Sequence, residues 1–171
     1  MIRMLWTIDA ISMGPLIYVL KEYFLSSFAK KNLLICGIVF VITVGITALC
    51  LFVSRKLPVD EFPQGAAKEF SLIDASELPT FLGYFFVSLS IPEGQYLLAG
   101  VIFFLLFLFV YRAQIFCYNP LLLLLGFHFY QVTIENGFQL LLITKQRNIR
   151  RAEGIWFEKL YRLNDYSYLD L

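Results

Sequence analysis

The run from Asn32 to Val53 constrains this chain more than any other segment, because it contains no charged residue. At 1.5 Å per residue, a helix of this length spans about 30 Å, the thickness of the hydrocarbon core of a bilayer. Lys30 and Lys31 precede the run, and Arg55 and Lys56 follow it. A surface helix of a soluble domain is apolar on one side only. The run therefore predicts a transmembrane helix.

The composition supports a membrane protein and excludes several other classes. Hydrophobic residues make up 59% of the chain and charged residues 16%, whereas soluble domains average about 45–50% and about 25%. The net charge of +1 does not fit a protein whose whole surface binds nucleic acid. With 171 residues, the chain has room for a few membrane spans and one small domain, but not for a separate catalytic domain of ordinary size.

Four apolar segments predict four membrane spans, at about residues 2–20, 32–53, 76–91 and 95–111. A span needs about 20 predominantly apolar residues. Between the second and third segments, residues 54–75 contain Pro, Gly and several charges, so we expect a solvated loop on the cytoplasmic side. The transmembrane region therefore corresponds to residues 1–112.

Two of these spans are irregular. The first contains Asp9, Gly14 and Pro15, and such interruptions are tolerated when neighbouring helices satisfy the freed backbone groups. The third has an apolar part, Leu78–Ile91, that measures only about 21 Å as a helix. It therefore begins earlier in the loop, lies in a thinned bilayer, or enters the membrane without crossing it.

Residues 113–171 change character and predict a small cytoplasmic domain. Two runs rich in β-branched and aromatic residues flank Asn136 and Gly137, and Asn-Gly between such runs is the strongest short-range signal for a β-hairpin. A hairpin centred on these two residues would gather one apolar set on a common face: Tyr130, Val132, Ile134, Leu141 and Ile143.

The segments on either side of the hairpin are less regular. Pro120 and Gly126 enclose too few apolar residues for a span, so we expect Leu121–Leu125 to form a buried strand. Near the other end, the segment Ala152–Leu160 predicts a helix. The domain is therefore expected to combine a hairpin and a helix in a small α/β arrangement.

The basic residues that flank the spans predict that both termini lie in the cytoplasm. With four crossings, Lys30 and Lys31 share one side with the acidic turn at residues 90–95. Lys and Arg are enriched in cytoplasmic loops. The larger basic set lies on the other side, which marks it as cytoplasmic: Arg3, Arg55, Lys56, Arg112 and the basic residues after Thr144.

Few residues suggest chemistry, and no common catalytic motif occurs in the sequence. Asp9 is the only acid well inside an apolar segment, and intramembrane ionisable groups are functional candidates because an unpaired one is costly. It could equally lie near the interface, or pair with Arg3 or a neighbouring chain. His128 lies in an aromatic run without a catalytic partner nearby in sequence, so we expect a structural histidine and no enzyme activity.

The three cysteines do not predict a metal site or a cofactor. Cys36 and Cys50 lie inside the long apolar run, where a thiol packs as a small hydrophobic group. Cys117 is the third, and no Cys-x-x-Cys motif or Cys/His cluster accompanies it.

A basic run follows the predicted hairpin and contains Lys145, Arg147, Arg150 and Arg151. It could be an ordinary positive flank of the spans, a surface that touches anionic headgroups, or a docking surface for an acidic or nucleic-acid-bound partner. Spacing alone does not separate these alternatives. Together with Trp156, these residues are our candidates for binding a partner protein.

Small residues in the long apolar run are candidates for oligomer contacts. Gly37 and Gly45 are eight residues apart on roughly one side of the predicted helix, and small residues let two membrane helices approach closely. Asp9 joins them as a polar group that could bind a second copy.

Three stretches resemble the KwaA family, the small four-span membrane subunits of the bacterial Kiwa anti-phage system: Leu78–Ile91, Tyr118–Val132 and Leu142–Arg150. The resemblance implies an inner-membrane homo-oligomer, a tetramer, that senses infection. It also implies assembly with KwaB, a cytoplasmic subunit that binds DNA and acts as the effector. The family's membrane subunit has no catalytic residues, so none is transferred to this chain.

The sequence thus predicts an integral membrane protein, mainly α, with a four-helix transmembrane bundle and a cytoplasmic α/β domain at residues 113–171. We expect it to act as a sensor and scaffold that recruits a KwaB-like effector, without binding nucleic acid itself. The alternative is a small oligomeric channel or transporter, whose pore would be lined by Thr43, Thr47 and Ser88.

Overall fold

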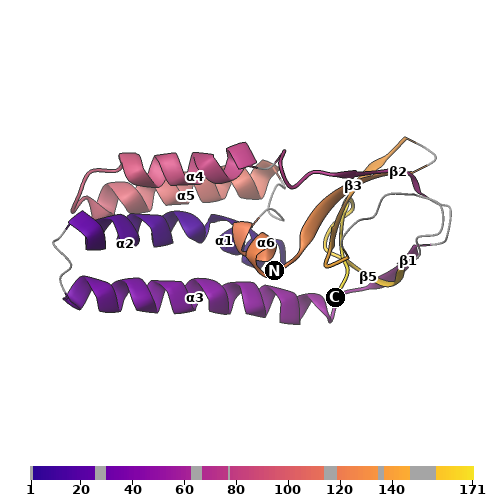
Figure 1. Ribbon diagram of the computed structural model, residues 1–171, viewed down its shortest axis with the longest axis horizontal. Coiled ribbons are helices and arrows are strands. Elements are labelled where there is room, and N and C mark those ends of the chain that lie inside the picture. Colours follow the sequence, from indigo (N-terminus) through magenta and orange to yellow (C-terminus); the bar gives the residue numbers. More distant parts are fainter. Residues whose placement is uncertain are drawn as a thin grey trace. The chain divides into compact units, whose positions relative to one another are not determined.

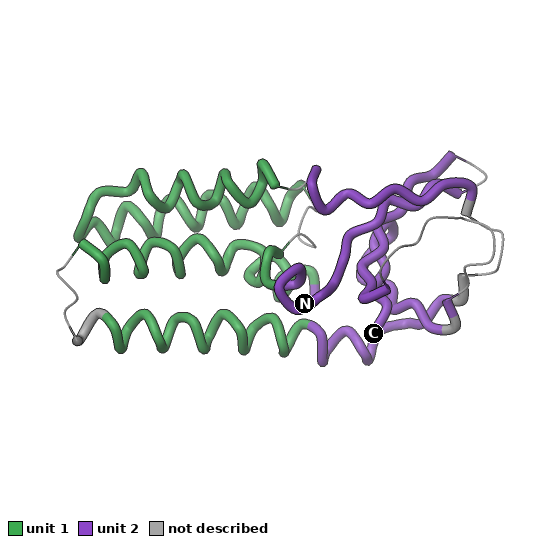
Figure 2. Tube along the Cα trace, viewed as in Figure 1, with its two compact units in different colours: residues 1, 3–50, 78–121 green, residues 2, 51–77, 122–171 purple. Residues whose placement is uncertain are grey.

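The computed structural model shows how the helices and strands are arranged (Figure 1). Two compact units are present, and Figure 2 colours them separately. The helical unit contains residues 3–50 and 78–121, and the sheet unit contains residues 51–77 and 122–171. The structure describes residues 2–25, 30–62, 67–76, 78–113, 119–134, 137–146 and 157–171.

The long helices belong mainly to the helical unit, and three stretches of described helix are long and apolar enough to cross a membrane. These stretches are Ile2–Leu25, Leu33–Ser54 and Tyr96–Ala113, which agrees with the membrane protein predicted from the sequence. The helices are α1 (Ile2–Ile11), α2 (Met13–Leu25), α3 (Lys30–Ser54), α4 (Leu78–Ser90) and α5 (Tyr96–Ala113).

The segment expected to form the third span is a short helix. With 13 residues, α4 measures about 20 Å, which is less than the hydrocarbon thickness of a bilayer. A membrane crossing by residues 76–91, and with it the four-helix transmembrane bundle, therefore stays a prediction.

The first span is broken where its sequence is irregular. The break at Ser12 separates α1 from α2, and Pro15 cannot donate the hydrogen bond that would continue the helix across it. The hydroxyl of Ser12 donates to the carbonyl oxygen of Asp9 at 2.6 Å, and the Ser12 amide donates to the same oxygen at 3.2 Å. At the end of α1, the carbonyl group of Asp9 is thus satisfied locally, as a membrane interior requires.

Close packing of α2 against α4 and α5 depends on Gly14. A Cβ atom at this position would lie 2.7 Å from Cε1 of Phe103, closer than real Cβ contacts. The hydroxyl of Ser88 donates to the Gly14 carbonyl oxygen at 3.0 Å. A small residue and an interhelical hydrogen bond at one crossing are typical of membrane helix packing.

The turn between α4 and α5 is held by the end of α2. The ammonium group of Lys21 donates to the carbonyl oxygens of Leu89, at 2.9 Å, and of Ile91, which have no partners inside α4 because a helix leaves its last carbonyls unpaired. The carboxylate of Glu22 accepts from the amide of Gly94 at 3.0 Å, where the φ of +71° favours glycine.

The sheet unit contains a mixed sheet of six strands among its described residues, in the order β1-β5-β6-β4-β3-β2. Neighbouring strands are antiparallel except β4 and β6, which are parallel. The strands are β1 (Val59–Phe62), β2 (Ala67–Leu72), β3 (His128–Ile134), β4 (Gln139–Thr144), β5 (Phe157–Arg162) and β6 (Ser167–Leu169).

The short connection between β1 and β2 forces this sheet to curve. The strands β1 and β2 follow one another in sequence but occupy opposite edges of the sheet. Six flat strands would separate the two edges by about 24 Å, whereas five residue steps from Phe62 to Ala67 reach at most about 18 Å. The sheet therefore curls so that its edges approach each other.

An apolar cluster fills one side of the curved sheet. Its buried members are Tyr130, Val132, Leu142, Phe157 and Leu160. The half-buried residues Phe70, Leu140 and Tyr168 pack against them. At about 25 cal/mol per Å² of apolar surface, such burial is the main stabilising contribution in the sheet unit.

The predicted hairpin exists, but its register differs from our expectation by one residue. The Ile134 amide donates to the Phe138 carbonyl oxygen at 3.0 Å, so these two residues lie opposite each other, and Gly137 has a φ of +76°. Tyr130 therefore pairs with Leu142. The prediction that Leu141 and Ile143 share the face of Tyr130 is wrong, because a shift of one residue moves a strand's side chains to the other face.

Residues 54–75, which we expected to form a loop, contain β1 and β2. Both are edge strands, where charged residues such as Lys68 and Glu69 in β2 are tolerated. The sheet unit thus takes in residues 51–77 as well as the C-terminal part of the chain.

Two further predictions are wrong. The segment Leu121–Leu125 lies mostly in a helix, α6 (Pro120–Leu124), and not in a strand. The predicted helix Ala152–Leu160 is wrong where it overlaps β5, from Phe157 onward, and its earlier residues lie outside the described part of the chain.

The helix α6 carries signals at both ends. The Asn119 side chain accepts a hydrogen bond from the amide of Leu121 at 2.9 Å, which caps the helix, and Pro120 occupies the first helical position. At the other end, Gly126 has a φ of +83°. Its amide and that of Phe127 donate back to the carbonyl oxygens of Leu123 and Leu122, which is the Schellman pattern.

Candidate functional site: a buried polar cluster

The helix α3 buries polar and small residues and exposes its apolar ones. Within the described side chains of α3, residues 33–54, the buried positions are Thr43, Thr47, Cys50 and Ser54. They recur at three- and four-residue spacing and so form one stripe. Val41, on the other side of the helix, is 69% exposed. This inverted pattern suits a helix surrounded by lipid.

A polar cluster forms where this stripe meets α1. The Thr47 hydroxyl lies 2.6 Å from Oδ1 of Asp9. The Asn119 amide group donates to the backbone carbonyl oxygen of Asp9 at 3.1 Å and lies 3.5 Å from Oγ1 of Thr47. All three side chains are at most 1% exposed. We call Asp9, Thr47 and Asn119 the polar cluster.

The cluster brings together three elements that are far apart in sequence. Asp9 lies near the end of α1, Thr47 in the second half of α3, and Asn119 at the N-cap of α6. Sequence reasoning singled out Asp9 but missed Thr47 and Asn119 as its partners. The pair Asn119-Pro120, a helix N-cap followed by the favoured first residue, is the signal that could have drawn attention to this position.

The hydrogen bonds of the cluster allow two arrangements. Thr47 has one hydroxyl proton, which can go to Oδ1 of Asp9 at 2.6 Å or to the Thr43 carbonyl oxygen at 3.2 Å. If the Asp9 carboxyl group carries a proton, it can donate to Thr47, which then donates to Thr43. The other carboxyl oxygen, Oδ2, is buried and has no hydrogen-bond partner among the described residues. Such an orphaned oxygen is costly in a low-dielectric interior.

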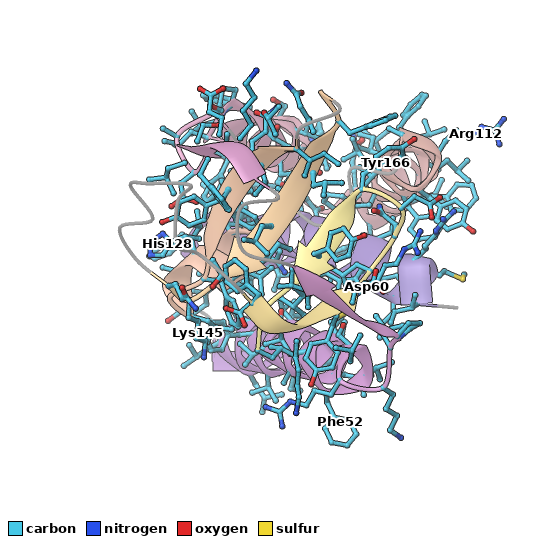
Figure 3. The ribbon with its side chains drawn as sticks, turned by 90° about the vertical axis from the view of Figure 1, so that its right-hand side faces the viewer. Phe52, Asp60, Arg112, His128, Lys145 and Tyr166 are labelled. Atoms are coloured by element: carbon cyan, nitrogen blue, oxygen red, sulfur yellow. The ribbon has the colours of Figure 1, made fainter. Side chains whose placement is uncertain are left out.

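The predicted partner-binding residues are only partly described. The Lys145 side chain lies in the sheet unit with its ammonium 4.7 Å from the centroid of the Phe127 ring, which is a cation–π contact. Figure 3 labels Lys145 near His128, and the strand register supports this, since His128 pairs with Thr144. The other candidates, Arg147, Arg150, Arg151 and Trp156, lie outside the described residues.

The predicted oligomer residues fall into two kinds of environment. A Cβ atom at Gly37 or Gly45 would meet nothing within 4 Å, so that both positions are open to a neighbouring helix. Asp9, in contrast, is buried inside the protomer and bonded to Thr47.

His128 has a carboxylate partner in the sheet unit, as expected for a structural histidine. Its Nδ1 atom lies 2.7 Å from Oδ2 of Asp74, whose other oxygen accepts from the amide of Phe129 at 2.7 Å. This arrangement fixes the turn that follows β2. In the same unit, burial and the nearby Asp60 carboxylate raise the pKa of the Tyr168 hydroxyl, which stays neutral at physiological pH.

Comparison with known proteins gives one positive result. The family model for the anti-phage protein KwaA matches residues 2–169, which is nearly the whole chain. Neither a curated protein nor a solved structure matches. In the described part of the chain, no group of His, Cys, Asp or Glu residues is placed to hold a metal ion.

Proposed function

Because this chain belongs to the KwaA family of anti-phage proteins, we propose that it is the membrane-embedded sensor and scaffold of a defence complex. It would lie in the bacterial inner membrane as a homo-oligomer with both termini in the cytoplasm. The sheet unit would recruit a cytoplasmic, DNA-binding effector of the KwaB kind. The three long apolar helices and the six-stranded sheet support this proposal.

The polar cluster is the observation that best supports the proposed sensor function. Two of its residues lie on elements that continue along the chain into the sheet unit: α3 runs on to Ser54, and α6 runs on to Leu124. Asp9 binds both elements from the broken first span. A perturbation of the membrane that shifts α1 would therefore change the hydrogen bonds that hold α3 and α6.

Substitutions in the cluster test this proposal. Asp9→Leu and Thr47→Val should abolish protection against phage while the protein still inserts and accumulates, because both remove the hydrogen bond between α1 and α3. Asp9→Asn, which keeps an acceptor oxygen, should retain partial protection. Efficiency of plating with matched membrane-protein levels is the measurement. Met4→Ala, on an exposed position of α1 (52%), is the control, and full protection by Asp9→Leu would contradict the proposal.

Effector recruitment is best tested with charge reversals. Removing residues 138–171 would delete β4, β5 and β6 and so destroy the sheet. Lys145→Glu combined with Arg147→Glu should instead reduce co-purification of the effector from detergent extracts. The matched control is Lys68→Glu with Lys159→Glu, two exposed lysines of the same unit. Equal loss of the effector in both pairs would argue against a specific basic docking surface.

The alternative function, an oligomeric channel, has less support. A pore between copies would need exposed polar residues, but Thr43, Thr47 and Ser88 are all at most 2% exposed within one chain. Each of their hydroxyl groups has at least one acceptor within hydrogen-bond distance in the same chain.

A further inference from the structure

An apolar groove lies between three elements of the helical unit. It has a volume of about 380 Å³, within the range of small-molecule sites. The broken first span, α3 and α5 supply its walls, which include Ile8, Val39, Ile42, Ile46, Phe103 and Phe104.

The two hydroxyl groups in the lining are already used. Ser12 donates to the carbonyl oxygen of Asp9 at 2.6 Å, and Thr43 donates to the carbonyl oxygen of Val39 at 2.9 Å. The groove therefore offers a ligand only carbon surface, and a polar ligand would lose its hydrogen bonds to water on entering.

The groove is open on the side that the membrane would cover. Ile8, Ile42 and Phe104 line it from three different elements, and they are 41%, 54% and 59% exposed. All three lie in the stretches long and apolar enough to span a bilayer. The surroundings of this opening are therefore hydrocarbon chains, which are as apolar as the lining itself.

We propose that the groove binds one acyl chain of a bilayer phospholipid. A hydrocarbon chain is narrow and flexible enough to fill such a space, whereas a helix with its side chains is about 10–12 Å across. The ring of Phe103, which packs against Gly14, forms the wall on the α5 side. The bound chain would fill the space between α3 and α5 beside the break at Ser12.

Two valines of α3 provide a matched test. Val39 lines the groove, whereas Val41 is 69% exposed and does not line it. Val39→Trp should fill the groove, and Val41→Trp should not. Native mass spectrometry of the purified chain in mild detergent should show one retained phospholipid in the wild type and in Val41→Trp, and several-fold less in Val39→Trp. Equal retention in the two variants would overturn the proposal.

Photo-crosslinking locates the bound acyl chain in the wild-type protein and so does not depend on whether a variant folds. The wild-type protein is reconstituted in phosphatidylethanolamine that carries a diazirine on one acyl chain. Adducts should concentrate at Ile42, Ile46 and Phe104, and an even distribution that includes Val41 and Leu34 would show unspecific lipid contact and overturn the proposal.

A disulfide experiment tests whether a second copy of the protein occupies the groove instead. Efficient disulfide formation in membranes between Ile42→Cys of one copy and Phe104→Cys of another would show this and would also overturn the proposal.

Both measurements use the isolated chain, without effector or phage. A failure here would therefore leave the proposed sensor function untouched, and a loss of protection in the cluster variants would leave the lipid site untouched.

Discussion

The helix α3 and the strands of the sheet unit bury opposite kinds of side chain. In the sheet unit, apolar residues such as Val132 and Leu169 are buried, at 2% and 0% exposure. In α3, the buried stripe is polar or small, while Val41 is 69% exposed. The difference shows that burial along α3 cannot be read as hydrophobicity, and this is the pattern expected of a helix whose neighbour is lipid and not water.

The largest effect is expected from a charge in the core of the sheet unit. Leu169 lies in β6, in the middle of the sheet, and is fully buried. Leu169→Asp should destabilise the unit by more than about 4 kcal/mol, because it buries an unpaired charge. Proteolysis of the detergent-solubilised chain should then cleave the sheet unit and spare the long helices. Leu171→Asp, at 42% exposure, should have little effect, and equal resistance of both variants would show that β6 is not central.

The same substitution at two exposed valines should separate the units. Val41 in α3 and Val59 in β1 are both exposed, at 69% and 47%. Val41→Asp should cost about 2.5–3.5 kcal/mol of membrane insertion, the cost of an acid at the centre of a span. Val59→Asp should leave membrane insertion unchanged and lower the stability of the sheet unit by no more than about 1 kcal/mol, since an exposed side chain of an edge strand contacts water. Membrane fractionation and glycosylation mapping measure insertion, and similar losses in both variants would contradict the contrast between the units.

Two glycines should differ by their backbone conformation. Gly137→Ala should destabilise the sheet unit by about 1–2 kcal/mol, because its φ of +76° is strained for a residue with a Cβ atom. Gly100→Ala in α5 should be close to neutral, since a Cβ there meets nothing within 4 Å. Thermal unfolding in detergent checks both, and an unchanged midpoint in Gly137→Ala would mean that the hairpin adapts.

The smallest expected effect on stability concerns the polar cluster. Thr47→Val keeps the shape of the side chain but removes its hydrogen bonds to Asp9 and Thr43. Interhelical hydrogen bonds in membranes contribute about 0.6 kcal/mol on average and at most about 1.7. A much larger loss in reversible unfolding would show that the cluster is a structural core and not a site poised to change.

Sequence reasoning reached the parts of the fold that depend on composition and on local turns. The uncharged run at 32–53 predicted α3, and Asn136-Gly137 predicted the hairpin. It missed β1, β2, β5 and β6. The edge strands β1 and β2 carry polar residues and pair with strands far away in sequence, and β6 has only three residues. The start of β5 was assigned to a helix. The helix signals of α6, Asn119-Pro120 at its start and Gly126 after its end, are present in the sequence. The apolar run between them led us to predict a strand instead.

The candidate site was predictable only in part for a similar reason. Asp9 stands out because an acid in an apolar segment is rare. Its partners Thr47 and Asn119 are 38 and 110 residues away in sequence, and Thr is common in membrane helices. Only the arrangement of α1, α3 and α6 identifies them.

The position of β6 has a consequence for how the protein is made. Residues 167–169 are synthesised after every other strand, yet they join β5 to β4. Until the ribosome has passed them, the nascent chain holds two separate pieces, one with β1 and β5 and the other with β2, β3 and β4. A prematurely terminated product could therefore insert its helices without displaying a finished surface to any cytoplasmic protein.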